Sequence, residues 1–112
     1  EWAVRRTAFG SYAVPVGYGV EIAALLDTAT TFGVEGIAQV ELGRRTHRHH
    51  RHDTLGPMAV QVMAAAEARR GIRRGEAKVE LRQFDVSDER FVPRIRRVDV
   101  AERPPFDSVA SA

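Results

Sequence analysis

The sequence contains no cysteine, which excludes a disulfide framework and any metal site built from thiolate ligands. It also lacks an apolar run of roughly eighteen residues, the length that a membrane-spanning helix needs. No basic segment leads into a short hydrophobic one, so we expect no secretory signal peptide. These absences together favour a cytoplasmic protein without a membrane span.

Lysine is nearly absent, since Lys78 is the one lysine among 17 basic residues. A genomic preference for arginine codons explains this ratio but not where the arginines gather. Residues 43–75 hold eight arginines against two acidic residues, although the whole chain has a net charge of only +2. The planar guanidinium fork suits phosphate and carboxylate groups. We therefore predict an anionic ligand near residues 44–51. Nucleic acid is disfavoured, because no aromatic residues are interleaved there to stack on bases.

The size and composition are those of one soluble domain. The chain has 112 residues, of which 44% are hydrophobic and 29% charged. It opens on Glu1-Trp2-Ala3 without a methionine, so we expect a fragment of something longer.

Apolar spacing predicts a helix followed by a strand. Apolar residues recur with helical spacing over residues 20–32, and Gly33 is the expected stop. Residues 34–42 switch to a period of two, which predicts a half-buried strand. Residues 7–19, rich in glycine and aromatics, are expected to form a loop.

The second half predicts a helix and further strands. Asp53 or Thr54 is the expected cap of a helix that runs to about Arg70. Its expected apolar face consists of Leu55, Met58, Ala59, Val62, Met63 and Ala66. Strands are expected over 77–84 and 92–100, with a polar turn at 85–89 and an extended, partly disordered end. The fold class is α/β in the order helix, strand, loop, helix, strands, and it is too small to be a complete nucleotide-binding domain.

The most unusual local feature is a histidine cluster in the basic loop. Neutral imidazole binds divalent transition metals, but this spacing does not match a tetrahedral structural site. Three alternatives stay open: a solvated polar loop, a single histidine acting as a metal ligand, and a multi-histidine site. The cluster consists of His47, His49, His50 and His52.

Glu21 lies in the first turn of the first predicted helix, directly after the turn Gly17-Tyr18-Gly19. A carboxylate there is stabilised by the helix dipole, which is sufficient reason for its presence. The functional alternative is that the glycines let a substrate approach the backbone while Glu21 accepts its hydroxyl groups. Tyr18 then either packs on a sugar face or fills the core. No phosphate-binding loop, nucleophile elbow or Asp-x-Asp motif occurs in the chain.

Several segments read together resemble glucosyl-3-phosphoglycerate synthase, a retaining glycosyltransferase of the GT-A type. They extend over most of residues 12–105, and the resemblance is to the C-terminal half of that enzyme. The segments are Gly17-Tyr18-Gly19-Val20-Glu21-Ile22, Leu25-Leu26-Asp27, Ile37-Ala38-Gln39-Val40-Glu41-Leu42-Gly43, Arg45-Thr46-His47-Arg48, Leu55-Gly56-Pro57-Met58, Gln61-Val62, Leu81-Arg82-Gln83-Phe84 and Ala101-Glu102-Arg103-Pro104-Pro105.

The resemblance implies transfer of glucose from a nucleotide sugar, UDP-glucose, to 3-phosphoglycerate with Mg²⁺ or Mn²⁺ as cofactor. His47 would be the metal ligand and Arg45 would bind the nucleotide phosphates. Tyr18 and Glu21 would line the glucose and acceptor cavity, with Glu21 the candidate catalytic residue that positions the sugar. An arginine beside a metal-bound diphosphate agrees with the anion expected from charge alone.

The missing Asp-x-Asp motif implies that the nucleotide-binding N-terminal half lies outside this chain, which alone is expected to be inactive. We expect a homodimer and one C-terminal segment over 1–112: a loop (1–19), a metal- and acceptor-binding core (20–75), and strands with a tail (76–112). The alternative function is a non-catalytic self-association module with incidental histidines. A third is adventitious transition-metal binding by the histidine loop.

Overall fold

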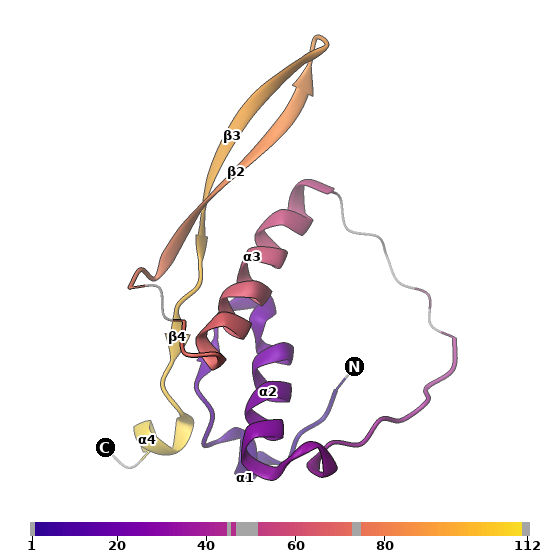
Figure 1. Ribbon diagram of the computed structural model, residues 1–112, viewed down its shortest axis with the longest axis vertical. Coiled ribbons are helices and arrows are strands. Elements are labelled where there is room, and N and C mark those ends of the chain that lie inside the picture. Colours follow the sequence, from indigo (N-terminus) through magenta and orange to yellow (C-terminus); the bar gives the residue numbers. More distant parts are fainter. Residues whose placement is uncertain (1, 45, 47–51, 73–74, 111–112) are drawn as a thin grey trace.

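The computed structural model describes residues 2–44, 46, 52–72 and 75–110. It has the expected α/β composition, and Figure 1 shows two long helices side by side with a β-hairpin projecting beyond them. The elements in order are α1 (Arg6–Phe9), β1 (Val14–Pro15), the 3₁₀ turn η1 (Gly17–Gly19), α2 (Val20–Phe32), the 3₁₀ turn η2 (Val34–Gly36), α3 (His52–Arg69), β2 (Lys78–Ser87), β3 (Arg90–Asp99), β4 (Glu102–Arg103) and α4 (Phe106–Ala110).

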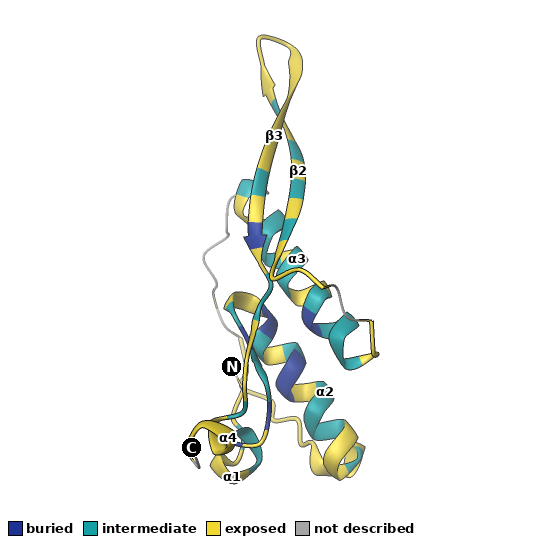
Figure 2. Cartoon of the chain, turned by 90° about the vertical axis from the view of Figure 1, so that its left-hand side faces the viewer, coloured by how far each residue is buried: buried dark blue, intermediate teal, exposed yellow. Residues whose placement is uncertain are grey.

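The helices α2 and α3 pack through small side chains. Ala23 and Ala24 of α2 and Ala65 of α3 are buried, which lets the two backbones approach closely. Helix α2 has the predicted bounds, and Gly33 ends it in the left-handed region at φ 75°. Figure 2 shows how few residues are buried elsewhere. The radius of gyration is 17.1 Å. This is larger than the value of about 13 Å for a compact domain of 100 residues, so the chain is extended for its length.

Helix α3 buries a different face from the one that its apolar spacing predicted. Leu55 and Val62 are exposed, and Met63 is 61% exposed. Ala65 instead faces α2 and the turn η1. The predicted apolar face was therefore wrong for Leu55, Ala59, Val62 and Met63, which are exposed, whereas Met58 and Ala66 are half-buried.

The beginning of α3 also differs from the prediction. The helix starts at His52 rather than after a cap at Asp53 or Thr54, and Pro57 therefore lies inside it. A proline lacks the N–H that would bond to the carbonyl four residues earlier. That carbonyl belongs to Asp53, and it accepts a hydrogen bond from Nη1 of Arg96 at 3.5 Å.

The strand predicted over residues 34–42 is absent. After the turn η2 the chain continues to residue 44 without regular secondary structure, and its apolar side chains Val34, Ile37, Val40 and Leu42 are exposed. The described strands form only the pairs β1 with β4 and β2 with β3. A strand needs a neighbour for its backbone N–H and C=O groups, and no described strand lies beside this segment.

The predicted C-terminal strands are confirmed and form a longer hairpin. Antiparallel pairing runs from Lys78 opposite Asp99 to Ser87 opposite Arg90. The polar turn is shorter than predicted, because only Asp88 and Glu89 lie outside the strands, at φ 48° and 60°. Positive φ at both central residues matches the twist of a two-residue hairpin loop.

A second, very short sheet pairs residues near the beginning of the chain with residues near its end. Val14 pairs with Arg103, and Pro15 pairs with Glu102. The loop expected over 7–19 therefore contains β1 and η1, with α1 beginning just before it. The prediction of an extended end was likewise wrong for residues 106–110, since α4 forms there and the backbone N–H of Asp107 donates to the carbonyl of Gly10 at 3.0 Å. No helix in the described ranges has the length and apolar character to cross a membrane.

Candidate functional site

The turn η1 is held against α3 by one glutamine. Oε1 of Gln61 accepts a hydrogen bond from the backbone N–H of Tyr18 at 3.0 Å. Its Nε2 donates to the carbonyl of Asp99 at the end of β3, also at 3.0 Å. This single side chain therefore connects the turn before α2 to the base of the hairpin.

Both glycines of the turn are required by close packing. Gly17 has φ +69°, and a Cβ there would lie 2.3 Å from Oε1 of Gln61. A Cβ on Gly19 would lie 2.8 Å from the Cβ of Ala65 and 2.9 Å from the carbonyl oxygen of Gln61. A larger residue at position 19 would push the turn away from α3, whereas at position 17 the end of the Gln61 side chain could move and the positive φ is the stronger constraint. The glycines thus serve packing within the chain.

Two of the four predicted site residues lie together at this turn. Tyr18 is 53% exposed, which rules out the alternative in which it fills the core. Glu21 is exposed in the first turn of α2, three residues further along the chain. The packed turn thus presents an aromatic ring and a carboxylate at the beginning of one helix, a combination that can stack on a sugar and accept hydroxyl groups.

The other two predicted site residues, Arg45 and His47, lie outside the described residues. Their nearest described neighbours, Arg44 and Thr46, are exposed and belong to no helix or strand. Within the described part of the chain, no group of three histidine, aspartate or glutamate side chains lies close enough to hold a metal ion. The predicted metal site thus stays a prediction.

A surface hollow of about 360 Å³ lies between the end of α3 and the chain leaving β3. Its lining is mostly alanine and backbone, with the carboxylates of Glu76 and Glu102 as its charged groups. It includes neither Tyr18 nor Glu21. The hollow is thus a separate feature from the predicted sugar site.

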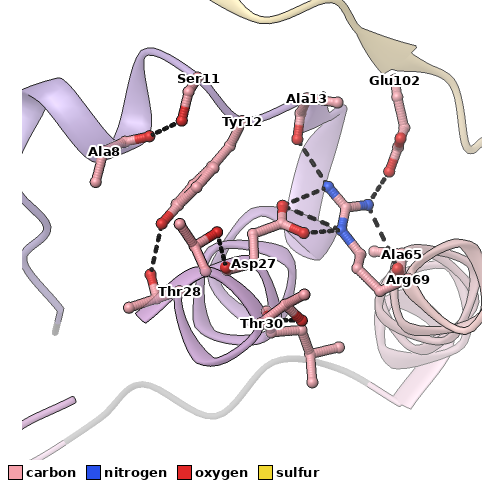
Figure 3. Close-up of polar contacts among 12 residues, drawn as sticks. Ala8, Ser11, Tyr12, Ala13, Asp27, Thr28, Thr30, Ala65, Arg69 and Glu102 are labelled. Atoms are coloured by element: carbon pink, nitrogen blue, oxygen red, sulfur yellow. Dashed lines mark hydrogen bonds and ion pairs between the residues drawn. The ribbon is translucent and has the colours of Figure 1, made fainter. Parts of the chain in front are cut away.

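A partly buried ion-pair network joins α2, α3 and β4 (Figure 3). The side chain of Arg69, at the end of α3, is only 9% exposed. Its Nη2 is 3.0 Å from Oδ2 of Asp27 on α2, and its Nη1 pairs with Glu102 of β4. The Nη2 group also donates to the carbonyl of Ala13 at 2.7 Å. One guanidinium therefore joins both long helices to the short β1–β4 sheet.

The electrostatics of this network favour the charged arginine. Burial of the guanidinium opposes its charge and would lower the pKa of Arg69. Hydrogen bonds and the negative charge of Asp27 and Glu102 outweigh that effect, so the pKa of Arg69 is raised above its ordinary value. The network therefore holds Arg69 in its positively charged form.

Sequence reasoning missed the residues that position the turn. Asp27 and Gln61 belong to segments that carry the resemblance, but neither was given a role, and no contact of Arg69 was predicted. A signal was present for Arg69 and Asp27, since a charged residue within each apolar helix suggests a partner of opposite sign. The contacts of Gln61 could not be predicted, because its partners are backbone atoms distant in the chain.

The chain is similar over nearly its whole length to known glucosyl-3-phosphoglycerate synthases. It is 40% identical over 109 residues to the enzyme from Mycolicibacterium smegmatis, covering 97% of this chain and 35% of that protein. It is 45% identical over 62 residues to the enzyme from Petrotoga mobilis, covering 55% of this chain and 19% of that protein. No protein-family model matches the sequence.

Solved structures give the same result. A crystal structure of glucosyl-3-phosphoglycerate synthase from Mycobacterium tuberculosis, in complex with Mn²⁺, UDP and phosphoglyceric acid, superposes with a TM-score of 0.83 at 37% identity. A second, with Mg²⁺ and UDP, has a TM-score of 0.82 at 38% identity. Each match covers 95% of this chain and 36% of the solved chain. The chain thus spans about a third of the length of its relatives, as a C-terminal piece of a GT-A domain would.

Proposed function

We propose that this chain is the acceptor- and metal-binding part of a retaining glucosyltransferase that moves glucose from UDP-glucose to 3-phosphoglycerate. The observation that carries the proposal is the 37% identity and TM-score of 0.83 to a synthase structure whose ligands are Mn²⁺, UDP and phosphoglyceric acid. The remaining nucleotide-binding part of such an enzyme lies beyond the residues of this chain. The proposed setting is cytoplasmic.

Within this proposal, the η1 turn forms one wall of the sugar site. Tyr18 stacks on the face of the glucose, and the carboxylate of Glu21 accepts hydrogen bonds from its hydroxyl groups. Two observations support these roles: both residues are exposed, and the turn that carries them is fixed by Gln61. A rigid wall favours transfer because it holds the sugar in one orientation.

Arg45 and His47 belong to the donor side of the proposed site. The guanidinium of Arg45 binds the diphosphate and balances the charge that develops on it as glucose leaves. The imidazole of His47 is one ligand of Mg²⁺ or Mn²⁺, which would supply charge neutralisation at the diphosphate. The described residues do not complete a metal site, so the proposal requires the other ligands to come from the missing part.

Substitution of His47 tests the metal assignment in an enzyme that contains this chain together with its nucleotide-binding part. His47→Ala should abolish Mg²⁺-dependent transfer, whereas His49→Ala, in the same loop, should leave it nearly unchanged. Near-normal turnover of His47→Ala would contradict the assignment. An equal loss of transfer activity in both variants would indicate that the whole loop, rather than His47 alone, is required. Calorimetry with Ni²⁺ and Zn²⁺ on a variant lacking all four histidines measures the adventitious binding that remained an alternative.

Arg45 has a separate test. Arg45→Ala should raise the KM for UDP-glucose by about tenfold or more, the effect of losing a charge-assisted phosphate contact. Arg44→Ala is the matched control, since it removes the neighbouring guanidinium. An unchanged KM in the Arg45 variant would remove this residue from the donor site. This chain by itself should show no transfer.

The proposal also includes a homodimer. The alternative function, a non-catalytic self-association module, predicts self-association as well. The projecting hairpin and its exposed apolar side chains favour self-association. Size-exclusion chromatography without nucleotide sugar or metal separates the two functions. A chain that dimerises while its enzyme never binds UDP-glucose would be a module only.

A further inference from the structure

The η1 turn is held at two points by the segment that follows β3. The backbone N–H of Val16, directly before the turn, donates to the carbonyl of Ala101 at 3.0 Å. The backbone N–H of Tyr18, inside the turn, is connected to the carbonyl of Asp99 through the side chain of Gln61. Both carbonyls lie where β3 ends and the chain continues to β4 (Figure 1). The turn before α2 is thus connected twice to the base of the hairpin.

The side chain of Asp99 closes these two connections into a ring. Its Oδ1 accepts a hydrogen bond from the backbone N–H of Ala101. From the carbonyl of Asp99 the ring passes through Gln61 to Tyr18. It returns from Val16 through Ala101 to the Asp99 carboxylate. Each of the four hydrogen bonds is 3.0 Å long, and we call the five residues that they join the positioning ring.

The ring is anchored on a paired strand rather than on a loop. Asp99 is the last residue of β3 and lies opposite Lys78 in the hairpin. Directly after it, the backbone N–H of Val100 donates to the carbonyl of Ala77 at 2.8 Å. Directly before it, Val98 is buried and only 5% exposed. The register of the hairpin therefore sets the position from which the η1 turn is held.

We propose that Asp99 and Gln61 are positioning residues of the sugar site. The ring fixes the backbone of the η1 turn, and with it the direction of the Tyr18 side chain and the beginning of the helix that carries Glu21. The inference rests on the proposed function, in which these two side chains bind the glucose of the donor. Groups that are held in one orientation before the substrate arrives bind it at a lower entropic cost. The effect is confined to the sugar, because the turn makes no proposed contact with the nucleotide.

Amide hydrogen exchange in this chain tests the ring itself. Asp99→Ala removes one acceptor, but opening the ring should speed exchange of the Ala101, Val16 and Tyr18 amides together, by about threefold to tenfold. Asp99→Asn should keep the slow exchange, since its amide oxygen accepts the same hydrogen bond. Glu80→Ala, at an exposed position of β2, is the control and should leave all three amides unchanged. Faster exchange of the Ala101 amide alone would show that no ring exists.

Donor kinetics test the positioning role in an enzyme that contains this chain together with its nucleotide-binding part. Asp99→Ala and Gln61→Leu should each raise the KM for UDP-glucose by about threefold to tenfold, whereas the Kd for UDP, measured by calorimetry, should change less than about twofold. A general loss of structure would weaken the binding of both ligands. The double variant should be about as impaired as the stronger single variant, because either substitution opens the same ring. Asp99→Asn should keep the wild-type KM.

Tyr18→Ala separates this inference from the proposed function. A raised KM for UDP-glucose in Tyr18→Ala with a normal KM in Asp99→Ala would overturn the positioning role and leave the sugar site in place. An unchanged KM in Tyr18→Ala would overturn the sugar site, and the positioning role with it. An Asp99→Asn variant as impaired as Asp99→Ala, or an equal rise in the Kd for UDP, would also contradict the role proposed for the ring.

Discussion

Gln61 on α3 accepts a hydrogen bond from the backbone of Tyr18 at 3.0 Å, although the two residues are 43 positions apart in the sequence. The same side chain donates to the backbone of Asp99. The turn that carries Tyr18 is therefore positioned by a side chain of α3 that also reaches the end of β3.

Replacement of Gln61 by leucine should loosen this turn. The change removes both hydrogen bonds at similar side-chain size, so the free energy of unfolding should fall by about 1–2 kcal/mol. Urea unfolding followed by circular dichroism measures the loss. Gln39→Leu, in the exposed segment after η2, is the control and should change stability by less than about 0.5 kcal/mol. Equal effects of the two substitutions would contradict the bridging role of Gln61.

Gly17→Ala should destabilise the chain for two reasons. The residue has φ +69°, and the added methyl group would lie 2.3 Å from Oε1 of Gln61. We expect a loss of about 1–3 kcal/mol. Gly75→Ala, where nothing lies within 4 Å, should have little effect. Combining Gly17→Ala with Gln61→Ala relieves the collision, so the double variant should lose less stability than the sum of the single variants; a fully additive result would show that backbone strain alone matters.

Arg69→Lys tests the ion-pair network. Lysine keeps the positive charge but lacks the planar fork that reaches Asp27, Glu102 and the carbonyl of Ala13 together. The free energy of unfolding should fall by about 1–2 kcal/mol, because partly buried acceptors lose hydrogen bonds from the guanidinium. Arg70→Lys, at the exposed neighbouring position, should be nearly neutral. A cycle with Asp27→Asn measures the coupling, and absence of coupling would contradict a shared network.

Hydrogen exchange tests the segment that was expected to be a strand. In this chain the backbone amides of residues 38–44 should exchange without protection, because no described strand pairs with them. In a longer protein that supplies the rest of the GT-A domain, alternate residues of this segment should become protected. Amides that remain unprotected there would show that the alternating pattern does not specify a strand.

Local sequence patterns predicted the helices and strands whose formation depends mainly on neighbouring residues. The period of α2 and its terminating Gly33 are properties of adjacent residues, and both agree with the structure. The alternation over residues 77–84 predicted a strand, and β2 with its half-buried Val79 and Leu81 agrees with it, because strand periodicity does not depend on distant parts of the chain. The structure places Tyr18 in the turn η1 and Glu21 in the first turn of α2, and their roles stay predictions.

Contacts between segments that are distant in the sequence could not be predicted from local patterns. Only the tertiary structure showed that α3 meets α2 through Ala65 and leaves Met63 exposed, because the choice of face depends on which partner is present. The same reason explains the missing strand over residues 34–42, whose pattern is that of a strand but which has no described neighbour. The bridges made by Gln61 and Arg69 join groups from remote segments. The sequence by itself determined the local elements and the chemical groups, whereas packing decided their partners, since close contact depends on the positions of both sides.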